Sequence, residues 1–214
     1  PPHLKNTVHV SGFSEERLKL KHPGGKAHVI QMLEKQIVTS DVVEEVPWKV
    51  LDGEKYFVPD GEYQKIAVIE RHKNTGKMGV GIVKGYGIRG GAIASSVSHD
   101  SHNIIVVGDN DRDMALAVKE MMRTQGGYTL VRDGEIYGTL PLPVMGLMSD
   151  AGYESVNEAL AKMIPKAYEM GVKDGFDPFI TLSFMALPVI PEIRITPRGI
   201  YLVKEDRMLR TPFC

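Results

Sequence analysis

A short stretch in the middle of the chain concentrates side chains that can do chemistry. Ser98-His-Asp-Ser-His-Asn103 combines two imidazoles, a carboxylate, a carboxamide and two hydroxyls. Imidazole and carboxylate groups can transfer protons, ligate a metal or bind a polar ligand near neutral pH. The alternative is a structural loop whose polar side chains satisfy nearby backbone groups. If the loop is functional, the candidate catalytic residues are His99, Asp100 and His102, and the candidate substrate-binding residues are Ser101 and Asn103.

Two apolar runs flank this polar stretch and must position it. Ile104 to Val107 is β-branched and stops at Gly108, which is typical of a buried strand. Gly91 to Val97 predicts a second strand, although a short helix also fits its small residues. A polar loop between two buried elements lies at the rim of a core, where folds commonly carry function.

The rest of the chain alternates strand patterns with two helical patterns. Residues 1–62 are interpreted as a strand-rich connecting segment, with short strands at Thr7–Val10, 27–33 and 36–43, and residues 63–214 as an α+β domain. We expect mixed, largely antiparallel pairing with hairpins, because strands arrive in runs and Asp133-Gly134 is a favoured hairpin turn. The remaining predicted elements are a hairpin over 65–83, a helix after Asp109-Asn-Asp111, a hairpin over 128–140, a helix over 155–170, and a buried strand or turn over 178–191.

Bulk composition excludes several classes of protein. The net charge of -1 and the mixing of acids and bases argue against a nucleic-acid or anionic-membrane surface. One cysteine, Cys214, excludes an internal disulfide framework and a cysteine-based zinc site. No run approaches the roughly 20 apolar residues of a membrane helix, so we expect a cytoplasmic protein.

Two further motifs match known sites by letter only. Gly85-Tyr-Gly-Ile-Arg-Gly90 has the spacing of a dinucleotide fingerprint, but a strand-like run follows where that site needs a helix. Asp109, Asp111, Asp113 and Glu120 fall at calcium-loop positions, but Met114 stands where the loop needs glycine. We therefore interpret the first motif as a glycine-rich bend and the acids of the second as helix-capping groups.

Several segments together resemble the C-terminal part of bacterial adenine deaminases of the amidohydrolase superfamily. The resemblance covers about residues 60 to 200, with a looser match before it. The segments that carry it are Glu70-Arg-His72, Gly90 to Asn103, Gly126-Gly127 with Leu140-Pro-Leu-Pro-Val-Met-Gly-Leu-Met-Ser149, and Pro178 to Glu192.

This resemblance implies hydrolytic deamination of adenine to hypoxanthine and ammonia by a longer enzyme. In such enzymes a (β/α)₈ barrel holds a divalent centre, often manganese or iron, and lies N-terminal to the part that matches here. The metal-binding histidines of that barrel are absent from this chain, so we expect it to bind no metal by itself and to be inactive alone. It would cover or support the active site of its own N-terminal barrel, and a homo-oligomer is compatible with this interpretation.

Two alternatives remain open. The chain could be an independent enzyme in which His99, Asp100 and His102 form a small metal or acid–base site. It could also be a noncatalytic structural or oligomerisation module. If it covers a barrel, an apolar surface should flank the polar loop, and the candidates are 140–148 and 179–190.

Overall fold

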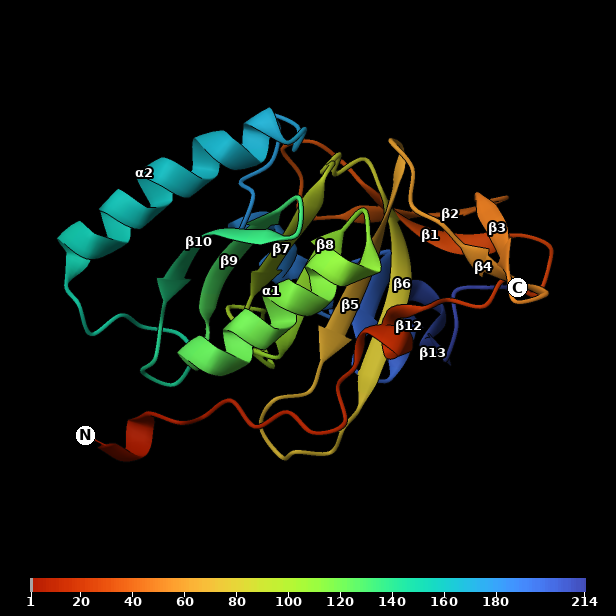
Figure 1. Ribbon diagram of the computed structural model, residues 1–214. Helices are drawn as coiled ribbons and strands as arrows, with labels where there is room; N and C mark the ends of the chain where they lie inside the picture. Colours follow the sequence, from red (N-terminus) through yellow and green to blue (C-terminus); the bar gives the residue numbers. More distant parts are fainter. Residues whose placement is uncertain (1) are drawn as a thin grey trace.

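An eight-stranded sheet forms the centre of the computed structural model, which describes residues 2–214 (Figure 1). The strand order is β10-β9-β7-β8-β5-β6-β1-β2. Within residues 2–214 of this sheet, β1 and β6 are the one parallel pair. The strands are β1 (Ala27–Met32), β2 (Thr39–Glu44), β5 (Tyr63–Ile69), β6 (Met78–Lys84), β7 (Gly91–Ser95), β8 (Ile104–Gly108), β9 (Gly127–Arg132) and β10 (Glu135–Pro141).

Two small sheets and the helices surround the central sheet. β3 (Trp48–Leu51) pairs with β4 (Glu54–Phe57), and β11 (Ile193–Thr196), β12 (Gly199–Leu202) and β13 (Arg207–Leu209) form the other small sheet. The α-helices are α1 (Asp111–Thr124), α2 (Tyr153–Glu169) and the one-turn α3 (Ile180–Ser183). Short 3₁₀ turns occur at Pro2–Leu4, Glu15–Leu18, Phe184–Ala186 and Val203–Glu205.

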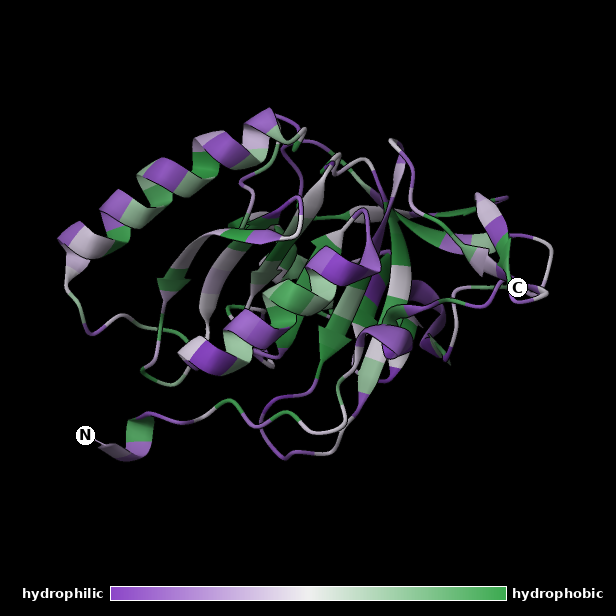
Figure 2. Cartoon of the chain, in the orientation of Figure 1, coloured by the Kyte–Doolittle hydropathy of each residue, from purple (hydrophilic) through white to green (hydrophobic). Residues whose placement is uncertain are grey.

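Both faces of the central sheet are buried. Ala67 and Ile69 of β5 point to the face that α1 covers, whereas Ile66 and Val68 point to the face covered by α2 and residues 176–186. An antiparallel sheet usually shows alternating polar and apolar residues because one face meets water. Here two covered faces explain the apolar runs at 66–69 in β5 and 104–107 in β8. The end of β5 is green, hence hydrophobic, in Figure 2.

Local signals account for the hairpins and the first long helix. β5 and β6 pair antiparallel over their whole length, and β9 and β10 pair across the predicted Asp133-Gly134 turn. Asn110 caps α1, because its side-chain oxygen accepts a hydrogen bond of 2.8 Å from the Asp113 amide. The predicted α+β class with two main helices and largely antiparallel pairing is confirmed, and residues 2–214 contain no closed barrel.

One predicted strand is wrong. Thr7–Val10 is an irregular strap held by hydrogen bonds such as His9 amide to Arg71 carbonyl, 2.7 Å. Of the two forms expected for residues 178–191, a strand or a turn, the structure has helical turns, namely α3 and a 3₁₀ turn. The Asp177 carboxylate accepts hydrogen bonds from the Phe179 and Ile180 amides and starts the first of them.

β1 and β2, from the predicted connecting segment, complete one side of the central sheet. The division of the chain at residue 62 stays a prediction. No helix within residues 2–214 has the length and apolar character needed to cross a membrane.

Candidate functional site

The Ser98–Asn103 loop connects β7 to β8 at one end of the central sheet. β8 also pairs antiparallel with β5, and Ile104 at the start of β8 lies opposite Ile69 at the end of β5. Residues 70–72, which continue from β5, therefore lie beside residues 101–103. The His72 Nε2 atom is 2.6 Å from the Ser101 carbonyl oxygen, and the Arg71 amide donates a 3.3 Å hydrogen bond to Asn103 Oδ1. Strand register thus brings together two motifs that are separate in the sequence.

Backbone hydrogen bonds hold the His102 imidazole in one orientation. His102 adopts a left-handed backbone conformation with φ of 48°, and its amide donates to the Ser98 carbonyl at 2.6 Å. The Ser98 amide in turn donates to His102 Nδ1 at 3.3 Å. An Nδ1 atom that accepts this hydrogen bond carries no proton, so the neutral ring is protonated at Nε2.

The electrostatic surroundings keep this ring neutral. Partial burial lowers the pKa of His102, and the positive charges of His99, Arg71 and His72 lower it further, while Asp100 opposes them. At pH 7 His102 therefore presents an Nε2–H donor. It is not a base at Nδ1, because that lone pair is already used.

The other predicted residues have different environments. His99 lies against Phe184 with ring centroids 5.1 Å apart, and its amide donates to the Ser183 carbonyl at 2.9 Å. The Asp100 side chain is 87% exposed, with an oxygen 3.9 Å from His99 Nδ1. Ser101 is exposed, and its hydroxyl accepts a 3.0 Å hydrogen bond from the buried Asn103 amide group. The geometry leaves Asp100 and the two imidazoles available at the rim, whereas both ends of the Asn103 amide are engaged within the protein.

Arg71 is a component of this site to which sequence reasoning assigned no role. Its side chain is 1% exposed, and its Nε donates to the His102 carbonyl at 2.5 Å. Burial lowers the pKa of Arg71 to about 10, so the guanidinium remains charged at neutral pH. The available signal was its position directly after the buried run of β5, next to a loop that the β5–β8 pairing brings alongside.

Both apolar segments expected near the loop lie beside it. From the 140–148 segment, the Met145 carbonyl accepts a 3.0 Å hydrogen bond from Arg71 Nη2. From the 179–190 segment, the Ser183 carbonyl accepts a hydrogen bond from the His99 amide, and the Phe184 ring packs against the His99 imidazole. Each segment combines buried residues with exposed apolar side chains, which are Met145 (44%), Met148 (52%), Ile180 (53%) and Val189 (75%). Val189 also lines an open groove of about 580 Å³ together with Glu70 and Met208.

The donor groups of this site do not fit a divalent metal centre. Within residues 2–214, no group of three or more His, Cys, Asp or Glu side chains is placed to hold a metal ion. His102 Nδ1 is occupied by the Ser98 amide, which leaves His99 and Asp100 as the nearest free donors. A protein site for a catalytic transition metal normally has about three ligands.

Comparison with known proteins identifies the family. The sequence model of the adenine deaminase C-terminal domain matches residues 36–207. This chain belongs to that family. A protein named adenine deaminase from Desulfitobacterium hafniense is 50% identical over 207 residues, covering 97% of this chain and 36% of the relative. The adenine deaminase of Nitratidesulfovibrio vulgaris (strain DP4) is 45% identical over 204 residues, with 95% and 35% covered. That of Bacillus subtilis is 47% identical over 179 residues, with 83% and 30% covered. The chain thus spans about a third of the length of these relatives.

The glycine-rich bend of this adenine deaminase C-terminal domain has a packing explanation. Strand β7 begins at Gly91, so no helix follows the third glycine of the motif. A Cβ atom at Gly87 would lie 2.4 Å from the Gly171 carbonyl oxygen, and one at Gly171 would lie 2.6 Å from the Gly87 carbonyl oxygen. The two segments cross too closely for side chains. Asp109, from the calcium-like pattern, accepts hydrogen bonds from the Gly90 and Gly91 amides and so holds this bend.

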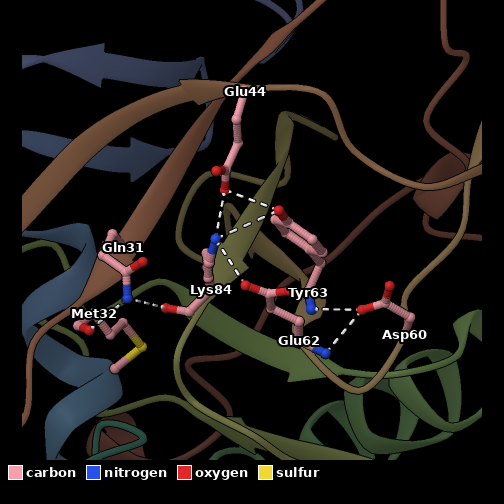
Figure 3. Close-up of polar contacts among 7 residues, drawn as sticks. All are labelled: Gln31, Met32, Glu44, Asp60, Glu62, Tyr63 and Lys84. Atoms are coloured by element: carbon pink, nitrogen blue, oxygen red, sulfur yellow. Dashed lines mark hydrogen bonds and ion pairs between the residues drawn. The ribbon is translucent and has the colours of Figure 1, made fainter.

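A second polar cluster joins β2, β5 and β6 (Figure 3). Lys84 Nζ lies 3.0 Å from Glu44 and 2.8 Å from Glu62, and the Tyr63 hydroxyl donates to the same Glu44 oxygen at 3.0 Å. Hydrogen bonds to Glu62, Glu44 and Tyr63 raise the pKa of Lys84 despite the opposing effect of burial. The three charges satisfy one another, so this cluster ties strands together rather than offering a free reactive group.

Proposed function

We propose that this chain is the C-terminal part of an adenine deaminase and covers an active site formed by the region that precedes it. The reaction would be adenine plus water to hypoxanthine plus ammonia. The observation that carries this proposal is the position of the Ser98–Asn103 loop between two segments with exposed apolar side chains. Docking an apolar rim would bring the polar loop to the substrate and exclude water from it.

In this proposal the residues of the loop have distinct roles. His102 donates a hydrogen bond from Nε2 to a lone pair on the purine, because its Nδ1 already accepts one from Ser98. Asp100 receives or delivers a proton at the rim, since its carboxylate is exposed there. His99 packs on Phe184, and its Nδ1 lies 3.9 Å from an Asp100 carboxylate oxygen. Ser101 and Asn103 are proposed to assist substrate binding, with Asn103 acting by shaping the loop.

The divalent metal implied by the resemblance, manganese or iron, would be held by residues outside this chain. The side chains near the Ser98–Asn103 loop do not fit such a metal, because they offer too few free donors. A place in purine metabolism belongs to the same proposal, which is supported by relatives that carry the name adenine deaminase. A cytoplasmic location is also part of the proposal.

The test uses the enzyme that contains both this chain and the preceding region. His102→Asn keeps a residue that tolerates the left-handed backbone, and Asp100→Ala removes the rim carboxylate. We expect Asp100→Ala to lower adenine turnover by about 10²- to 10⁴-fold, the usual effect of losing a proton-transfer group. His102→Asn should also lower turnover, by about 10²- to 10³-fold, the usual effect of losing a hydrogen-bond donor to the reacting group. Asp174→Ala, which removes an exposed carboxylate outside the loop, serves as the control and should leave turnover unchanged.

Two results would favour the alternatives. Near-normal turnover in both loop variants would make this a noncatalytic supporting module. Adenine turnover by the purified 214-residue chain alone, abolished by a chelator and restored by Mn²⁺, would make it an independent enzyme.

A further inference from the structure

Arg71 is a buried cation without a carboxylate partner. Its side chain is 1% exposed, and no ion pair joins it to Asp or Glu within residues 2–214. Taking a guanidinium out of water is unfavourable unless its donors are satisfied. The contacts of Arg71 therefore indicate why a charge is kept at this position.

Those contacts are backbone carbonyls from three separate segments. Nε donates to His102 at 2.5 Å, Nη1 to Thr7 at 3.2 Å and Nη2 to Met145 at 3.0 Å. The planar guanidinium presents donors in a rigid fork, so it can hold three diverging carbonyls at once. A lysine ammonium has three donors on one atom and cannot span them.

Close packing adds to this rigidity. Gly146 packs against the guanidinium, where a Cβ atom would lie 2.9 Å from Cζ. The Gly146 carbonyl also accepts a 2.5 Å hydrogen bond from the buried Ser96 hydroxyl, just before the Ser98–Asn103 loop. The guanidinium therefore has little freedom to shift without moving the segments that it holds.

Two of the three segments are also joined to each other. The Met145 amide donates to the Leu4 carbonyl at 2.6 Å, and Lys5 pairs with Asp150 at 2.5 Å. Residues 2–7 are the part of this chain nearest in sequence to the preceding region. Met145 and Met148 belong to the exposed apolar rim. Arg71 thus contacts Thr7 in the N-terminal segment, Met145 in the exposed apolar segment, and the Ser98–Asn103 loop that carries His102.

We propose that Arg71 is a positioning residue that couples the seating of residues 2–7 and 144–148 to the orientation of His102. The effect of Arg71 on turnover rests on the proposed function. Its effect on the orientation of the His102 ring does not, and it can be tested in this chain alone. Arg71 holds the His102 carbonyl while the Ser98 amide holds its Nδ1, so displacement of the carbonyl tilts the ring.

Arg194 provides a matched control. It is also fully buried, at 0% exposure, and its Nη1 and Nη2 atoms donate to the Ile37, Pro191 and Ile193 carbonyls and the Thr39 hydroxyl. Its buried Nε has no hydrogen-bond partner among residues 2–214. Burial lowers its pKa to about 10, as for Arg71. None of these partners belongs to the Ser98–Asn103 loop, so Arg194→Lys reports the general effect of disturbing a buried arginine.

The experiment compares Arg71→Lys with Arg194→Lys. In the 214-residue chain, ¹⁵N NMR of the imidazoles should show His102 as the Nε2–H tautomer in wild type and in Arg194→Lys. Arg71→Lys should shift these signals of the His102 tautomer. The other titratable groups near the ring, His99, Asp100 and His72, are the same in all these variants. In the longer enzyme, Arg71→Lys should lower kcat about 10²-fold with a smaller change in KM.

A second variant covers the case in which Arg71→Lys does not fold. Deleting residues 1–7 removes the Thr7 carbonyl, and none of residues 2–7 is buried, so the domain retains its core. The deletion should shift the His102 signals in the same direction as Arg71→Lys. Equal His102 spectra in wild type, the deletion and both lysine variants would overturn the proposal. A shifted spectrum together with unchanged turnover in His102→Asn would instead contradict the proposed function and leave the positioning role in place.

Discussion

Substitution of Gly87 by alanine tests the packing explanation of the glycine-rich bend. Gly87 has φ of 96°, and an added Cβ would lie 2.4 Å from the Gly171 carbonyl oxygen. Contacts of that length to backbone cannot be accommodated without moving one of the two segments. The bend therefore should not accept alanine whether or not any ligand is present.

Two effects of Gly87→Ala should lower the free energy of unfolding, and a third should partly offset them. A non-glycine residue at this positive φ costs about 1–3 kcal/mol, and forcing extra atoms into a packed site costs about 1–3 kcal/mol. Lower entropy of the unfolded chain returns about 0.4–1 kcal/mol. The net loss is about 1–5.6 kcal/mol, a large fraction of a typical domain stability of about 5–15 kcal/mol. For a chain of this size it corresponds to a midpoint about 2–22 °C lower.

The assay is urea and thermal unfolding of the chain, with Gly24→Ala as control. Gly24 has φ of 101°, but nothing lies within 4 Å of its added Cβ. Gly24→Ala should therefore lose stability only through the unfavourable backbone conformation, without a steric clash. Gly87→Ala should therefore lose about 1–3 kcal/mol more than Gly24→Ala. Equal losses in the two variants would refute the steric reasoning. Saturable NAD or ATP binding that Gly87→Ala abolishes would restore the nucleotide interpretation of the motif.

Two further predictions concern stability. Ser96→Ala should lower the free energy of unfolding by about 2 kcal/mol or more, because the buried hydroxyl accepts from the Gly127 amide at 2.8 Å and donates to the Gly146 carbonyl at 2.5 Å. Ser98→Ala, which removes a buried hydroxyl with no partner among residues 2–214, should lose much less in the same urea titration. Glu70→Gln should lower the thermal midpoint at pH 7, with the difference fading as pH falls from about 4.5 towards 2. Burial opposes ionisation of Glu70, but hydrogen bonds from Thr75, Lys73 and His72 outweigh it and lower its pKa to about 2. Its unfolded pKa is higher, so this stabilisation is complete above that value and is lost in acid. A constant difference from pH 7 to pH 2 would contradict it.

The parts of the fold that could be predicted are those specified by neighbouring residues. The Asp133-Gly134 turn and its flanking strands lie within one short stretch, and both turn residues adopt the positive φ that this turn requires. Asn110 and Asp113 of α1 are likewise three residues apart. The residues of each signal lie within a few positions of one another, so they can be recognised from the sequence alone.

The parts that could not be predicted depend on distant pairing. Arg71 reaches Thr7 and Met145, which are 64 and 74 residues away, and no local pattern specifies those contacts. The polar loop itself could be located from its flanking strands, but its association with residues 70–72 depends on the β5–β8 register. The same limit applies to 178–191, where Asp177 starts a helical turn in a sequence whose prolines and apolar residues suit several conformations.

The parallel pairing of β1 with β6 has a consequence for synthesis of the chain. β1 and β2 form an antiparallel hairpin early in the sequence, but the other neighbour of β1 is β6, where Ile30 lies opposite Val83. The β1–β2 hairpin is synthesised before β5 and β6, so one edge of β1 has no partner strand at that stage. Val29 and Ile30, which are buried in the folded domain, are then exposed. Open apolar strand edges are where nascent chains aggregate. The exposed edge of β1 can therefore be covered only after synthesis has reached Lys84.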